Sequence, residues 1–249
     1  MKIHDDVEKS GHWLFKHRSY FPLLIIPILL FALKDSEYFE RHFGHAIQTP
    51  WEVFCVTASF LGLLIRVLTV AHVPEGTSGR NTKGQLADSL NTEGMYSILR
   101  HPLYLGNFFI VLGFALFIQV WWFVIIFMLS FCIFYERIIF SEESFLERKF
   151  GAPYRKWAGE TPLFFPNLKH WKKPERHFSW KMVLKREYST FFGIIVGFVL
   201  IKFFADLVGE HEFKVRIVLL VFLGGGALVY FILRRIRKKT KWLHIKKAS

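Results

Sequence analysis

The feature that most constrains the fold is a run of 35 residues, His101–Tyr135, that contains no Asp, Glu, Lys or Arg. As a single helix with a rise of ~1.5 Å per residue it would be about 52 Å long, well beyond the ~30 Å hydrocarbon core of a bilayer. The run is therefore predicted to form two membrane-spanning helices that turn near Gln119. Hydrophobic residues make up 52% of the chain, including 29 Phe, which is typical of a membrane protein.

Four further apolar blocks, at 20–33, 51–72, 188–204 and 217–233, complete a layout of about six spans. In this layout 27 of the 33 Lys and Arg residues fall on one side of the membrane and 5 on the other, with Arg66 inside the second span. Lys and Arg accumulate in cytoplasmic loops, so both termini are expected in the cytoplasm. The sequence predicts an all-α polytopic membrane protein, with no sign of nucleic-acid binding or of an obligate protein partner.

The loop before the third span holds the first group of candidate site residues. Pro102 suits the first turn of a helix, where its missing N–H costs nothing. Free amides at a helix N-terminus attract anions, and Arg100 and His101 stand beside this one. Tyr96 and Tyr104 flank it. The competing interpretation is that Arg and Tyr are ordinary interfacial anchors and that Pro only starts the helix.

A second group follows the fourth span, where Glu142 and Glu143 lie a few residues after Arg137. On the charge pattern alone, the solvated face of a helix is the favoured interpretation. The two groups together favour function, because they resemble a known family.

That family is the integral-membrane isoprenylcysteine carboxyl methyltransferase superfamily, which also includes phospholipid methyltransferases. The positions that match its pattern are Gly94, Tyr96, Arg100, His101, Pro102, Tyr104 and Gly106, then Glu142, Glu143, Leu146, Phe150, Gly151 and Tyr154, followed by Pro162 and Pro166. Trp157 stands where the family commonly has Tyr. The resemblance covers residues 51–167 and divides the chain into an N-terminal segment with the first span (1–50), this methyltransferase core (51–167), and a linker with a C-terminal helical hairpin and basic tail (168–249).

The resemblance implies a cytoplasmic-face pocket for S-adenosyl-L-methionine, with Arg100, His101 and Arg137 as catalytic candidates. The residues implied to line the cofactor are Leu90, Asn91, Tyr96, His101, Pro102, Leu103, Tyr104, Glu142 and Glu143. The chemistry agrees, because aromatic faces stabilise a sulfonium cation and carboxylates accept from hydroxyl and amino groups. No metal is expected, since the sequence has no His/Cys cluster with metal-ligand spacing.

Arginines on the same face suggest the substrate. Arg66, Arg80 and Arg137 are expected to bind an anionic head group, because a guanidinium holds phosphate or carboxylate with two hydrogen bonds. The Gly79–Thr82 loop and the C-terminal hairpin are also similar to bacterial enzymes that methylate the lipid A 1-phosphate.

The expected function is S-adenosylmethionine-dependent O-methylation of an anionic lipid, with lipid A 1-phosphate as the best candidate and the bacterial inner membrane as the location. Three alternatives stay open at this point: phosphatidylethanolamine N-methylation, prenylcysteine carboxyl methylation, and an NADPH-dependent sterol-type reductase with a similar Arg-His-x-x-Tyr-x-Gly element.

Overall fold

The structure is a computed structural model that describes residues 2–18, 20–36, 44–74, 87–209 and 217–239. Within these ranges the chain is helical and forms no strand. The elements, in chain order, are α1 (Lys2–His17), α2 (Phe21–Ala32), the 3-10 turn η1 (Leu33–Asp35), α4 (His45–Val70), α5 (Met95–Ile98), α6 (Pro102–Phe117), α7 (Trp121–Phe150), α8 (Ala152–Glu160), η2 (Leu168–His170), α9 (Trp180–Gly209) and α10 (Ile217–Lys239).

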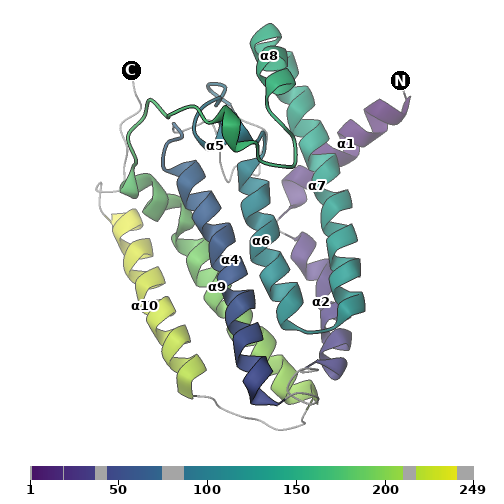
Figure 1. Cartoon of the computed structure of the whole chain (residues 1–249), viewed down its shortest axis with the longest axis vertical. Helices are drawn as coiled ribbons and strands as arrows, with labels where there is room; N and C mark the ends of the chain where they lie inside the picture. The colour runs from purple at the N-terminus through teal and green to yellow at the C-terminus, as the bar shows by residue number, and fades with distance from the viewer. Residues whose placement is uncertain (1, 19, 37–43, 75–86, 210–216, 240–249) are drawn as a thin grey trace.

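The long helices stand side by side as one bundle, in which α4, α6, α7, α9 and α10 alternate in direction (Figure 1). The hairpin predicted within 101–135 is confirmed: α6 ends at Phe117 and α7 begins at Trp121. Gln119 makes the turn with φ 64°, and its side-chain amide donates to Gln48 of α4 at 2.7 Å. The short helices α5 and α8 lie together at one end of the bundle (Figure 1).

Three described helices are long and apolar enough to cross a membrane: Ala46–Val70, Trp121–Phe150 and Trp180–Val208. The apolar helix α6 is shorter, at 16 residues, and α2 has 12. An all-α membrane protein therefore fits the structure. Two predicted spans were shorter than the helices that contain them. Helix α4 begins at His45 rather than at 51, and α9 runs from Trp180 to Gly209 rather than over 188–204.

A buried ion pair explains why the predicted span began only after Glu187 in α9. Glu187 and Lys202 lie inside this helix with side-chain exposures of 4% and 5%, and each pairs with a residue of α4. Glu187 meets Arg66 at 2.8 Å, and Lys202 meets Glu52 at 3.4 Å. A buried charge persists in an apolar helix when a partner compensates it. Arg66 is therefore not the only charged side chain buried within the long apolar helices.

Helices α4 and α6 approach each other closely through glycines. A Cβ added to Gly62 would lie 2.4 Å from the carbonyl oxygen of Gly106, and one added to Gly113 would lie 2.4 Å from the carbonyl oxygen of Cys55. Ser59 lies between these contacts and donates to the carbonyl of Ile110 at 2.8 Å. This contact fixes the N-terminal end of α6 relative to α4.

Helix α1 packs against the C-terminal half of α7, a contact that the mixed charges of the first 19 residues did not predict. Gly11 lies against the backbone carbonyl of Arg137, and Phe15 is buried with Phe134 and Ile138. Helix α2 continues along the other half of α7 (Figure 1). The N-terminal segment therefore covers one side of the helix that carries both glutamates.

Candidate functional site

The two sequence motifs meet where α6 begins and α7 approaches its end. His101 is the residue before α6, with φ −124° and ψ 63°, and Pro102 starts the helix. Its imidazole lies between the two carboxylates, with Nε2 3.2 Å from Oε1 of Glu143 and Nδ1 3.6 Å from Oε2 of Glu142. The His101 side chain is 9% exposed and the glutamates 23% and 24%. The arrangement is a half-buried acid–imidazole–acid cluster that is open to solvent on its carboxylate side.

Arg100 joins this cluster to the segment after α8. Its Nη1 donates to Glu143 at 2.9 Å, its Nε donates to the carbonyl of Thr161 at 2.8 Å, and its backbone N–H donates to the carbonyl of Pro162 at 3.0 Å. The first two contacts hold the guanidinium in place. The contacts to Thr161 and Pro162 also tie the proline-containing segment to the N-terminal end of α6.

Two buried aromatic residues of α8 lie next to Arg100 and the first motif. Trp157 donates from Nε1 to the backbone carbonyl of Tyr96 at 3.0 Å, so it ties α8 to the first motif. The hydroxyl of Tyr154 interacts with Arg100, while burial and, secondarily, the charge of Glu143 raise the pKa of Tyr154. Tyr154 therefore stays protonated at neutral pH. The Trp at 157 fills a place where its indole N–H has a partner.

Tyr104 extends the site one turn along α6. Its ring stacks on His101 with the centroids 5.5 Å apart and an interplanar angle of 10°. Its hydroxyl interacts with Glu142, and its ring lies 4.7 Å from that of Tyr135. An imidazole, two phenol rings and a carboxylate thus form one continuous surface.

Two glycines of the motifs are required by the backbone. Gly94 precedes α5 with φ 57° and ψ −130°, and Gly151 joins α7 to α8 with φ 59° and ψ −125°. Side chains disfavour this region of conformational space, whereas glycine occupies it freely. Each glycine turns the chain into a short helix that carries an aromatic residue of the site.

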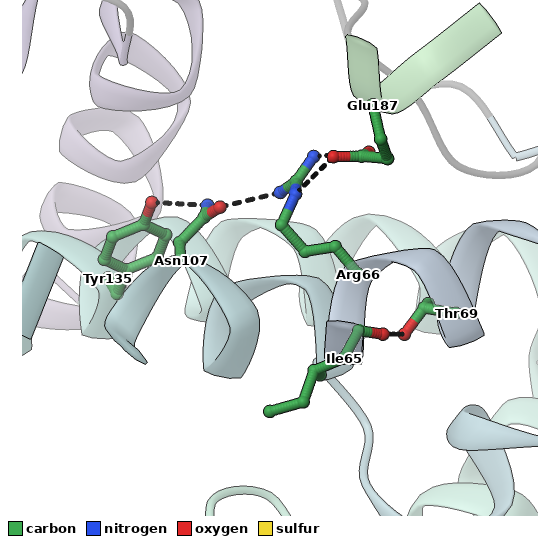
Figure 2. Close-up of polar contacts among 6 residues, drawn as sticks. All are labelled: Ile65, Arg66, Thr69, Asn107, Tyr135 and Glu187. Atoms are coloured by element: carbon green, nitrogen blue, oxygen red, sulfur yellow. Dashed lines mark hydrogen bonds and ion pairs between the residues drawn. The ribbon is translucent and has the colours of Figure 1, made fainter. Parts of the chain in front are cut away.

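A series of hydrogen bonds joins the helices α4, α6, α7 and α9 (Figure 2). Arg66 of α4 donates from Nε and Nη2 to the two carboxylate oxygens of Glu187 of α9, both at 2.8 Å. Its Nη1 donates to Oδ1 of Asn107 at 2.6 Å, and Nδ2 of Asn107 donates to the hydroxyl of Tyr135 at 2.9 Å. Sequence reasoning missed Asn107, Tyr135 and Glu187, although the amide of Asn107 within an apolar run was a usable signal.

Several predicted site residues lie elsewhere or have other partners. The guanidinium of Arg66, predicted to bind substrate, is held by Glu187 and Asn107 instead. Arg137 donates from Nη1 to the hydroxyl of Ser10 of α1 at 2.9 Å. Leu103 packs against Val70, Ala71 and Val183. Leu90 and Asn91 are half-buried in the loop before Gly94, and Arg80 lies outside the described residues.

No group of three or more His, Cys, Asp or Glu side chains is placed to hold a metal ion within the part of the chain that the structure describes.

Comparison with known proteins gives a family and two curated relatives. Residues 52–153 match the phospholipid methyltransferase family. The nickel-cobalt-cadmium resistance protein NccN of Alcaligenes xylosoxydans xylosoxydans is 29% identical over 156 residues, which are 63% of this chain and 68% of that protein. The cobalt-zinc-cadmium resistance protein CzcN of Cupriavidus metallidurans is 30% identical over 126 residues, 51% of this chain and 56% of that protein. No solved structure matches the chain.

Proposed function

We propose, from the match of residues 52–153 to the phospholipid methyltransferase family, that the chain is an S-adenosylmethionine-dependent O-methyltransferase. It would methylate an anionic lipid head group at the cytoplasmic leaflet. The observation that carries the proposal is the convergence of Arg100 and His101 with Glu142 and Glu143. The family match supports the assignment as a membrane methyltransferase. The cofactor, the acceptor and the roles of single residues are our proposals.

The residues of the cluster fit the cofactor by their chemistry. S-adenosylmethionine supplies an electrophilic methyl group on a sulfonium, which becomes a neutral thioether when the methyl leaves. The stacked rings of His101 and Tyr104 offer aromatic faces to a cation. Glu142 offers carboxylate oxygens to an amino group or to ribose hydroxyls, and Arg100 is a cation for a carboxylate. The remaining members of the proposed lining are Leu90, Asn91, Tyr96, Pro102, Leu103 and Glu143.

An anionic oxygen is the acceptor that suits this site best. A phosphate or carboxylate oxygen is already ionised at neutral pH, so it attacks the methyl carbon without losing a proton. The protein then has to orient the two reactants in line and exclude water, and orientation accounts for much of the acceleration in such reactions. An amine acceptor must in addition lose a proton to a base. Among anionic lipids we propose lipid A 1-phosphate, with Arg80 and Arg137 as its ligands.

Arg137 offers a test of the head-group assignment. We expect Arg137→Lys to lower methyl transfer about tenfold, because lysine keeps the charge but loses the planar fork. The matched variant Ser10→Ala removes the hydroxyl that Arg137 contacts on α1 and should leave transfer unchanged. Equal losses in the two variants would show that Arg137 serves α1 packing, and would remove it from the substrate site.

The names of the two curated relatives concern metal resistance and do not identify an acceptor. Lipid chemistry still offers a connection. A methyl ester removes an ionisable oxygen from a phosphate and so reduces the negative surface potential that draws cations to the membrane. We propose that methylation by this protein lowers the adsorption of divalent metal cations, which an electrophoretic mobility measurement on methylated and unmethylated vesicles in cobalt chloride would test.

The decisive experiment for the proposed function is mass spectrometry of total lipids from cells with wild-type protein, with Glu142→Gln and with neither. We expect one lipid to gain the mass of a methylene with wild-type protein only, on a phosphate oxygen. A methyl on nitrogen would favour phosphatidylethanolamine methylation, and identical lipid profiles in all three samples would refute lipid methylation.

A further inference from the structure

The hydrogen bonds that link Glu187 to Tyr135 through Arg66 and Asn107 have a fixed direction (Figure 2). A guanidinium has only donors, so the atom of Asn107 that faces Arg66 at 2.6 Å must be the amide oxygen. The amide nitrogen then faces Tyr135, where it donates to the phenolic oxygen at 2.9 Å. Glu187 is the first member of this series of hydrogen bonds, because its two carboxylate oxygens accept from the opposite side of the Arg66 guanidinium.

Because Tyr135 accepts from Asn107, its own hydrogen is directed to another acceptor. Within the described part of the chain, Asn107 is the only hydrogen-bond partner of this hydroxyl. Tyr104 differs, since its hydroxyl interacts with Glu142. The phenol O–H of Tyr135 is thus available as a donor, with no acceptor assigned to it among the described residues.

The position of this donor suits a lipid acceptor. The ring of Tyr135 lies 4.7 Å from that of Tyr104, which stacks on His101. Along α7, Tyr135 lies seven residues before Glu142. At ~1.5 Å per residue, Tyr135 is therefore about 10 Å further than Glu142 from the cytoplasmic end of the helix. A lipid head group that reaches the cluster from the bilayer would pass this level.

We propose that the hydroxyl of Tyr135 donates to the anionic oxygen that receives the methyl group, and that Asn107, Arg66 and Glu187 are positioning residues that keep this hydrogen available. The inference rests on the proposed function and adds to it a specificity for oxygen acceptors. An anionic oxygen has lone pairs both for this hydrogen bond and for attack on the methyl carbon. A neutral amine has one lone pair, which the same donor would occupy.

The inference also gives the C-terminal hairpin a part in the reaction. Glu187 belongs to α9, outside the family segment 52–153. Its carboxylate supplies the partner that an arginine within α4 needs. The hairpin would therefore act on the site through Arg66 and Asn107 rather than by contact with either reactant.

Asn107→Asp tests the direction of these hydrogen bonds, because it replaces the side-chain NH2 group by an oxygen. Aspartate still accepts from Arg66, but it now accepts from Tyr135 as well and takes up the phenol hydrogen. We expect Asn107→Asp and Tyr135→Phe each to lower kcat/KM for the lipid acceptor about tenfold, the size expected for one hydrogen bond to a charged group. Cofactor affinity should not change. The assay is transfer of labelled methyl from S-adenosylmethionine to vesicles of phosphatidylethanolamine, phosphatidylglycerol and lipid A by the purified full chain.

Glu187→Gln has a matched control at the other end of the same helices. Glu52 and Lys202 also pair α4 with α9, 3.4 Å apart, so Glu52→Gln loosens the same helix contact away from the cluster. Both variants should lose thermal stability. Only Glu187→Gln should also raise the KM for the lipid acceptor, because only it frees Arg66 from its place.

The results separate this inference from the proposed function. Wild-type protein that transfers no methyl to these vesicles would refute the proposed function itself. If wild-type protein transfers methyl and Tyr135→Phe has the same kcat/KM for the lipid acceptor, the role of the phenol is refuted. Wild-type kcat/KM in Asn107→Asp would refute the role assigned to the hydrogen-bond direction. Equal changes of the lipid KM in Glu187→Gln and Glu52→Gln would show that Glu187 acts only through the contact between α4 and α9.

Discussion

At the scale of single residues, His101 lies between two carboxylates and beneath one aromatic ring, and its neighbour Arg100 carries the counter-charge. Sequence reasoning identified these residues because short motifs encode them directly. It did not anticipate that Arg66 is occupied by Glu187, since these residues are 121 positions apart in the chain. A pairing across such a distance depends on how α9 packs on α4, and no local pattern reports it.

Substitutions in the cluster should separate binding from folding. We expect His101→Ala and Glu142→Gln to weaken S-adenosylmethionine binding by ~2–5 kcal/mol, the cost of removing one partner of a buried charge-assisted contact. That is roughly 30- to 4000-fold in affinity. Titration calorimetry in detergent measures the affinity, and circular dichroism checks the helix content.

The control for this pair is Glu147→Gln on the same helix. The Glu147 side chain is 49% exposed and meets only Arg155 among the salt bridges of the described residues, at 3.4 Å. The Glu147→Gln variant should bind the cofactor with the same affinity as the wild-type protein. Unchanged affinity in His101→Ala or Glu142→Gln would remove that residue from the cofactor site.

At the scale of elements, the hairpin of α6 and α7 was predictable because its charge-free length exceeds one membrane crossing. The full length of α9 was not, because its predicted span began only after Glu187, and the start of α4 was placed after Pro50, which the helix contains. The structure shows Glu187 paired with Arg66 of α4. Helix α1 was missed because its buried face is short, with Gly11 and Phe15 as the buried residues among those described.

Gly151 gives a prediction at this scale. Gly151→Ala should destabilise the protein by ~1–2 kcal/mol, the cost of placing a side chain in a left-handed conformation. Nothing lies within 4 Å of the position where the added Cβ would stand, so the cost is conformational alone. Thermal unfolding in detergent measures it. Gly159 in α8 is equally open, and Gly159→Ala should be neutral or stabilising, so equal losses in both variants would contradict the backbone explanation.

At the scale of the whole molecule, the alternating helices agree with the distribution of Lys and Arg, which predicts that the cluster faces the cytoplasm. Cysteine labelling tests this orientation. In a chain with Cys55 and Cys132 replaced by serine, we expect Asp35→Cys to react with an impermeant maleimide from outside the membrane and Lys173→Cys from the cytoplasmic side. Both positions are exposed. Labelling of both from one side would reject the six-span topology.

The central claim, that the cluster of His101, Glu142 and Glu143 transfers a methyl group to an anionic lipid, is tested most directly with a deuterated methyl donor. Purified protein in lipid A-containing vesicles would receive S-adenosylmethionine with a deuterated methyl group, and tandem mass spectrometry would locate the label. We predict a trideuteromethyl ester on a phosphate oxygen with wild-type protein and none with Glu142→Gln. Label on an amine nitrogen, or equal labelling by both proteins, would contradict the account.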